Sequence, residues 1–88
     1  MEAKEIRKRL KKAQPSLVRQ YLIPELWFKE DGKETEYWIF YYAFYNRFSD
    51  KMISDRIGYY SERHIYNISL QVIQNNLLLI SNFLHDYC

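Results

Sequence analysis

Polar side chains suited to reading DNA bases recur at helical spacing in the segment that begins at Ser61. If this segment is an α-helix, consecutive side chains are turned by about 100°. The polar residues then lie on the side opposite Ile65, Ile68 and Val72. Arginine pairs well with guanine, and asparagine or glutamine with adenine. We therefore predict a base-reading face made of Arg63, His64, Asn67, Gln71 and Gln74.

Positive charge is concentrated at the N-terminus. Residues 1–12 hold six basic and two acidic side chains, a balance of +4, whereas residues 13–88 hold seven basic and nine acidic side chains, a balance of −2. A basic N-terminal helix or arm over residues 1–13 is typical of a segment that follows a phosphate backbone or enters a groove. A solvated helical face that aids solubility is the alternative. The DNA-contacting residues predicted here are Lys8, Arg9, Lys11 and Lys12.

Residues that could support catalysis or metal binding are few. Cys88 is the single cysteine, and no glycine-rich phosphate loop is present. On one continuous helix, His64 and His85 would lie about 31 Å apart, too far to share a site. We predict no enzyme, no metal and no cofactor. The charged N-terminus and the shortness of the apolar runs predict a cytoplasmic protein without a membrane span.

The elements that must position these residues are predicted to be helices. Only two glycines and two prolines occur, which favours a few long helices, and an all-α fold, over many short strands. Residues 29–33 form the clearest loop. Residues 34–48 have the β-propensity of a buried strand, but no second strand is available to pair with them, so we prefer a helix. We expect the aromatic residues to carry the core. Those that share one face of this helix are Trp38, Tyr41, Tyr42, Tyr45 and Phe48.

A helix-turn-helix is predicted over residues 49–75. Ser49 is a good N-cap for a helix that runs to Ile57, and Gly58 suits the left-handed residue that ends it. Ser61 then caps the last helix, which is free of glycine and proline and can extend for about 25 residues. Ser61, near the start of that helix, is also placed to contact a phosphate, as are Tyr59 and Tyr60.

Two short segments carry a family resemblance. Ile53-Ser54-x-x-Ile57-Gly58 and Tyr60-Ser61-Glu62-Arg63-His64-Ile65-Tyr66 resemble the helix-turn-helix of sigma-factor region four, and most closely that of phage late-gene activators of the ArpU and RinA type. The resemblance covers about residues 37–73. It implies a phage or mobile-element transcriptional regulator that binds double-stranded DNA.

An apolar seam follows the second half of the last predicted helix. Its members alternate three and four residues apart, as in a heptad repeat, over residues 70–88. We predict either a symmetric dimer through this seam or its burial under the N-terminal helices of the same chain. In both cases residues 1–88 form a single domain. The seam residues are Leu70, Ile73, Leu77, Ile80, Leu84 and Tyr87.

The charge around the motif supports a second hypothesis. Within residues 49–75 the charges are balanced: Lys51, Arg56 and Arg63 oppose Asp50, Asp55 and Glu62. A DNA reader usually gains affinity from several phosphate-directed cations. The alternative is therefore a protein-binding phage inhibitor or adaptor on the same scaffold, directed at host RNA polymerase or at a defence nuclease such as a CRISPR effector. The tyrosines suited to such an interface are Tyr37, Tyr41, Tyr45, Tyr59 and Tyr60.

Overall fold

The computed structural model describes residues 2–26 and 33–87, and these residues form helices joined by short connections. The predicted all-α class is confirmed, and no strand occurs in the described part of the chain. Most of the predicted loop at 29–33, and Cys88, lie outside the described residues. The elements are α1 (Ala3–Lys12), α2 (Pro15–Leu17), the π-helical η1 (Val18–Leu22), α3 (Ile23–Leu26), α4 (Glu34–Phe44), α5 (Asp50–Ile57), α6 (Glu62–Asn75) and α7 (Leu77–Tyr87).

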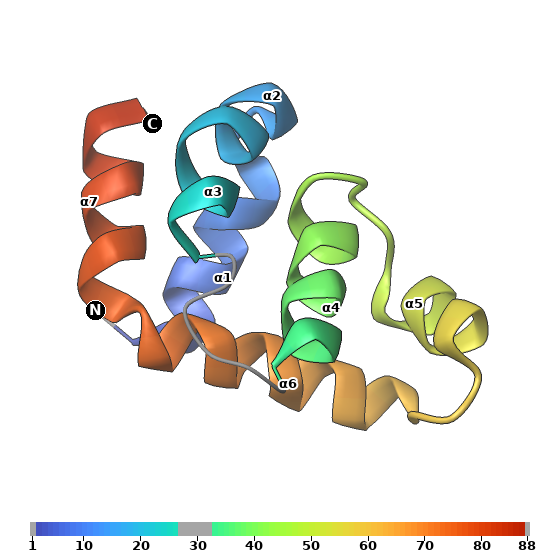
Figure 1. The fold of residues 1–88 in the computed structure, drawn as a ribbon. Coiled ribbons are helices and arrows are strands. Elements are labelled where there is room, and N and C mark those ends of the chain that lie inside the picture. Colours follow the sequence, from blue (N-terminus) through green and yellow to red (C-terminus); the bar gives the residue numbers. More distant parts are fainter. Residues whose placement is uncertain (1, 27–32, 88) are drawn as a thin grey trace.

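Helix α6 is the element on which the other long helices pack. In Figure 1 it runs along the base of the molecule, with α1, α4 and α7 rising from it and α5 beside its N-terminal end. It contacts α1, α4, α5 and α7. Its inward residues Ile65, Val72 and Ile73 are buried in a core shared with α1 and α4. This central position leaves one side of α6 exposed at the base of the fold.

The chain bends at Asn76, so the predicted continuous last helix is wrong. Asn76 has φ −127° and ψ 33°, outside the helical region. Its side-chain Nδ2 donates to the carbonyl of Val72 (2.9 Å), an acceptor left open where the helix ends. After the bend, α7 packs against α1 and η1 and buries Ile80, Phe83 and Leu84. A straight continuation would carry these apolar side chains away from the core.

Residues 34–44 are helical as predicted, but the buried side of the helix differs from the expectation. The buried residues of α4 are Ile39, Phe40, Ala43 and Phe44. The five aromatic residues predicted to share a face lie on the outer side of α4 and in the chain after it, half-buried or, for Trp38, exposed. The core is therefore mainly aliphatic, and the prediction that the aromatics carry it is wrong. The aliphatic residues fill the core because they come from helices on several sides of it, whereas the tyrosines must keep their hydroxyls near water.

The helix-turn-helix is formed with the predicted caps. The Ser49 hydroxyl accepts a hydrogen bond from the amide of Met52 (3.2 Å), and the Ser61 hydroxyl accepts one from the amide of His64 (3.1 Å). Gly58 ends α5 in the left-handed conformation, with φ 88°. The Ser54 hydroxyl donates to the carbonyl of Tyr60 and ties the turn to α5. Among the described residues, no helix has the length and apolar character needed to cross a bilayer.

Gly58→Ala is expected to lower the free energy of unfolding by about 1 kcal/mol. A Cβ at this position would meet nothing within 4 Å, so the cost comes from the positive φ alone. Gly58→Asn should cost less, because asparagine tolerates the left-handed region better than alanine does. Urea denaturation of the two variants beside the parent tests this. Equal stability of the alanine variant and the parent would contradict it.

Candidate nucleic-acid interface

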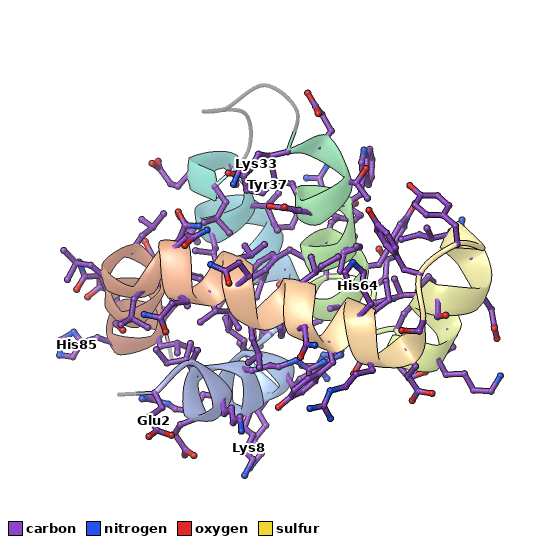
Figure 2. The ribbon with its side chains drawn as sticks, turned by 90° about the horizontal axis from the view of Figure 1, so that it is seen from below. Glu2, Lys8, Lys33, Tyr37, His64 and His85 are labelled. Carbon is purple, nitrogen blue, oxygen red and sulfur yellow. The ribbon has the colours of Figure 1, made fainter. Side chains whose placement is uncertain are left out.

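One exposed side of α6 carries four of the five predicted base-reading residues, and His64, which is also exposed, lies on another side of the helix (Figure 2). Arg63, Asn67, Gln71 and Gln74 are exposed, and they recur at three- and four-residue spacing. The opposite side is anchored in the core by Ile65, Ser69, Val72 and Ile73, all buried. The Ser61 cap and the Gly58 turn determine where α6 begins, and the packing of its apolar side on the core leaves the polar row facing outward.

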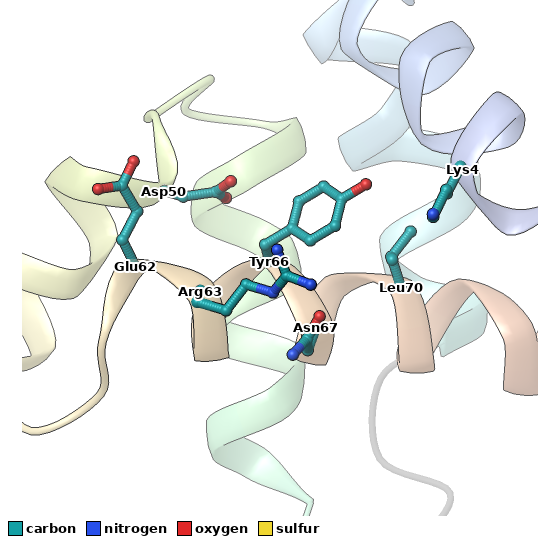
Figure 3. A pocket seen from close by; sticks show the side chains of 7 residues that line it. All are labelled: Lys4, Asp50, Glu62, Arg63, Tyr66, Asn67 and Leu70. Carbon is teal, nitrogen blue, oxygen red and sulfur yellow. The ribbon is translucent and has the colours of Figure 1, made fainter.

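A shallow groove separates this polar row from α1. It is lined at one end by Lys4, Asp50, Glu62, Arg63, Tyr66, Asn67 and Leu70, shown in Figure 3. In that view the Arg63 side chain extends along α6 toward Tyr66 and Asn67, and Lys4 approaches from α1. The groove continues past Leu70 to Gln71 and Gln74, with Glu2 and Ala3 on the α1 side. The structure thus brings Arg63, Asn67 and Gln71 together with a cation from another helix.

His64 and Ser61 lie apart from this groove. The His64 ring packs against the Tyr60 ring at a centroid distance of 4.5 Å, and Tyr60 lies 4.6 Å from the ring of Tyr59. Figure 2, which views the molecule from below, shows His64 on the side of α6 away from α1. Ser61 is exposed at the start of α6, with its hydroxyl engaged as the cap. Neither residue shares the line of Arg63, Asn67 and Gln71.

Of the helix or arm predicted over residues 1–13, the structure shows a helix, α1, which packs on the core. Ile6 and Leu10 of α1 are fully buried. Arg7 joins α1 to the helix-turn-helix: its guanidinium donates to Asp50 Oδ1 (2.8 Å) and to the Ser69 hydroxyl (2.9 Å), and it lies 4.6 Å from the centre of the Tyr66 ring. The Ser69 hydroxyl in turn donates to the carbonyl of Tyr66 (2.7 Å). This network fixes α1 along α6.

The amine of Lys11, one of the residues predicted to contact DNA, forms hydrogen bonds within the fold. Its Nζ donates to the carbonyl of Ala43 in the last turn of α4 (3.0 Å) and to that of Phe48 in the connection between α4 and α5 (3.1 Å). Burial lowers the pKa of the Lys11 amine, and the positive charges of Arg7 and Arg47 lower it further, against the opposing effect of Asp50. The amine thus satisfies a carbonyl of the last turn of α4 and ties α1 to the chain that follows α4.

The remaining basic residues of α1 point to different sides of the helix. Arg9 and Lys12 border a depression beside Tyr87 of α7, away from the polar row of α6. Lys8 is exposed and extends from α1 in Figure 2. Successive residues of a helix point in different directions, so a run of cations in sequence does not form one charged face. The positive charge predicted for a DNA-facing arm is thus divided between two surfaces.

The predicted dimer seam is largely covered by the chain itself. Ile73, Ile80 and Leu84 are buried in the core, and Leu70 and Leu77 are half-buried. The bend at Asn76 divides the six residues between two helices. Tyr87, the last of them, stacks on the ring of Tyr21 at 4.3 Å. The seam therefore does not present a continuous apolar surface to a second copy, and the alternative of burial within one chain describes these residues better.

Sequence reasoning missed two residues at this interface. Lys4 faces the polar row across the groove, and Tyr66 lines the groove beneath Arg63. The amphipathic pattern of residues 2–13 places Lys4 on the polar side of α1, but only the packing of α1 on α6 brings it to the groove.

Among the described residues, no cluster of three histidine, cysteine or acidic side chains could hold a metal ion. Comparisons with protein-family models, with curated proteins and with solved structures give no match to the chain.

Proposed function

We propose that this protein binds double-stranded DNA by placing α6 in the major groove and acts as a transcriptional regulator of the phage type that its motif resembles. The observation that carries the proposal is the exposed row of Arg63, Asn67 and Gln71, which follows directly from a capped helix-turn-helix. The 14 residues of α6 span about 21 Å, and the major groove of B-DNA admits a helix.

Each residue of the row has a role in this mode of binding. Arg63 is suited to the O6 and N7 atoms of guanine, and Asn67 and Gln71 to the N6 and N7 atoms of adenine. Lys4, across the groove, would neutralise a phosphate on the flanking strand, and Lys8 on the same helix a second one. Arg7 acts indirectly, because it holds α1 against α5 through Asp50 and against α6 through the Ser69 hydroxyl.

The charge distribution predicts that the affinity for DNA depends on salt concentration more weakly than is usual for a DNA-binding protein. Lys4 and Arg63 line the groove beside the polar row and Lys8 is exposed on α1, whereas Lys11 is engaged with carbonyls and Arg9 and Lys12 lie beside α7. The two phosphate contacts, from Lys4 and Lys8, correspond to a slope of about −2 in a plot of log K against log salt concentration. Sequence preference must then come mainly from the hydrogen bonds of α6 to base edges.

The test is retention of pooled genomic DNA fragments by the protein over a series of salt concentrations. Arg63→Ala combined with Asn67→Ala should weaken binding to the selected fragments by at least about 30-fold, since each base contact contributes about 1 kcal/mol or more. A matched control removes the same residue types elsewhere: Arg9→Ala with Asn82→Ala should bind like the parent. Failure of the parent to retain any fragment at low salt, or equal losses in both double variants, would overturn the proposal.

A further inference from the structure

The outer side of α4 carries a continuous network of aromatic rings that the proposed DNA-binding function does not use. Trp38 is at its N-terminal end, with its ring centre 5.5 Å from that of Tyr41 and 5.8 Å from that of Tyr42. Trp38 is 45% exposed. From it the network divides: Tyr41 leads to Tyr45 (5.0 Å), and Tyr42 leads to Phe48 (5.8 Å). We call these five residues the α4 surface.

Each branch of the α4 surface ends at an arginine from another element. The guanidinium of Arg19, from η1, lies 5.8 Å from the centre of the Tyr45 ring. That of Arg56, from α5, lies 5.2 Å from the centre of the Tyr42 ring and 5.7 Å from that of Phe48. Both arginines are exposed. The surface therefore combines an exposed indole with two cations, both over rings that follow Trp38 along the chain.

The polar edges of these two guanidinium groups are open to a ligand. Within residues 2–26 and 33–87, neither Arg19 nor Arg56 forms an ion pair with a carboxylate. A guanidinium held over a ring still directs its N–H groups outward in its own plane, in the fork that matches a carboxylate. Such aromatic and arginine side chains are the types that most often anchor protein interfaces.

We propose that the α4 surface docks an acidic segment of a partner protein, with an apolar side chain of that segment on Trp38 and its carboxylates on Arg19 and Arg56. The charge of the two arginines selects an acidic partner, and the exposed indole selects an apolar anchor. This surface lies on α4, η1 and α5, whereas the polar row lies on α6. Occupation of one does not require residues of the other.

The ring geometry favours a peptide over single-stranded nucleic acid. Arg56 lies over Tyr42, and Arg19 lies over Tyr45, so these rings do not offer free faces to successive bases. Stacking of a strand needs a series of accessible rings along the backbone path. A peptide needs only one apolar contact and two carboxylate contacts, and the α4 surface supplies these three.

The spacing along α4 restricts the sequence of the partner. Tyr42 and Tyr45, which carry the arginines, follow Trp38 by about 6 and 10 Å along the helix axis. An extended peptide covers about 3.3 Å per residue. The two acidic residues of the partner should thus lie about two and about three positions from its apolar residue.

The experiment uses a series of synthetic peptides that contain one leucine and a pair of aspartates, with the separation between the leucine and the aspartates increasing along the series. Each peptide is compared with a counterpart in which asparagine replaces aspartate. Binding to the full chain is measured by fluorescence anisotropy. We expect the aspartate peptides of the stated spacing to bind, their asparagine counterparts to bind at least about tenfold more weakly, and Arg56→Lys and Trp38→Ala to lose a similar factor. Arg63→Ala and Tyr59→Ala, on other surfaces, should not change binding.

Three results would overturn the proposal. The first is binding that does not distinguish aspartate from asparagine peptides, and the second is a dissociation constant weaker than about 1 mM for the whole set. The third is tighter binding of an oligo(dT) probe that depends on Trp38, which would identify the surface as a single-strand site. Circular dichroism of Arg56→Lys and Trp38→Ala confirms that any loss occurs in a folded chain. The genomic-fragment assay with Arg63→Ala and Asn67→Ala reports separately on DNA binding.

Discussion

Phe44→Ala is expected to lower the free energy of unfolding by about 3 to 5 kcal/mol, the largest single effect that we predict. Phe44 is fully buried on the inner side of α4, and its ring centre lies 4.5 Å from that of Phe40. The Nζ of Lys11 lies 5.4 Å from the same ring centre, so α1 packs over it. Truncation would leave a cavity between α1 and α4 that rigid helices cannot fully close.

Trp38→Ala is the matched control for Phe44→Ala. It removes a larger side chain from the same helix, but from a position that is 45% exposed, so we expect a loss below about 1.5 kcal/mol. Urea denaturation of both variants gives the comparison. A loss for Trp38→Ala as large as that for Phe44→Ala would mean that the aromatic side of α4 is the buried one, as the sequence suggested, and would contradict the fold described above.

Arg7→Met is expected to lower the free energy of unfolding by about 2 to 4 kcal/mol. The side chains of Arg7 and Asp50 are 14% and 17% exposed, so their ion pair is largely removed from water. Methionine keeps the apolar stem of the arginine but leaves the Asp50 carboxylate without its cation and the Ser69 hydroxyl without its donor. The loss of stability arises mainly because these two groups are left without their partner.

A double-mutant cycle of Arg7→Met with Asp50→Asn separates the pair from the general effect of altering α1. We expect a coupling of about 1 to 3 kcal/mol, because the two residues share one network. Lys4→Met, on the exposed side of the same helix, should change stability by less than about 0.5 kcal/mol. A coupling near zero would show that Arg7 and Asp50 act independently and that their ion pair does not hold α1 against α5.

The local features of the helix-turn-helix could be predicted from the sequence because each depends on a few neighbouring residues. Ser49 and Ser61 each cap a helix through an amide three residues later, and Gly58 adopts a φ that other residues avoid. The exposure of Arg63, Asn67 and Gln71 then follows from helical periodicity. The helix over residues 34–44 was also predictable, since no strand was available to pair with it.

The buried side of α4 could not be predicted in this way, because the segment is apolar around most of its circumference. Several faces of residues 34–44 satisfy the amphipathic pattern, and only the positions of α1 and α6 select Ile39, Phe40, Ala43 and Phe44. The same contacts decide the bend at Asn76. No proline or glycine marks it, and it forms because α7 buries Ile80 and Leu84 against α1 and η1 only after turning.

The sequence by itself determined the caps, the glycine turn and the polar row of α6, whose causes lie within a few residues of each other. The tertiary structure alone decided what the basic residues of α1 do: Arg7 binds Asp50, Lys11 binds the end of α4, and Lys4 meets the groove. It also buried half of the apolar seam. The reason is that burial and charge pairing depend on which distant helices meet, and helical periodicity within one segment carries no information about that.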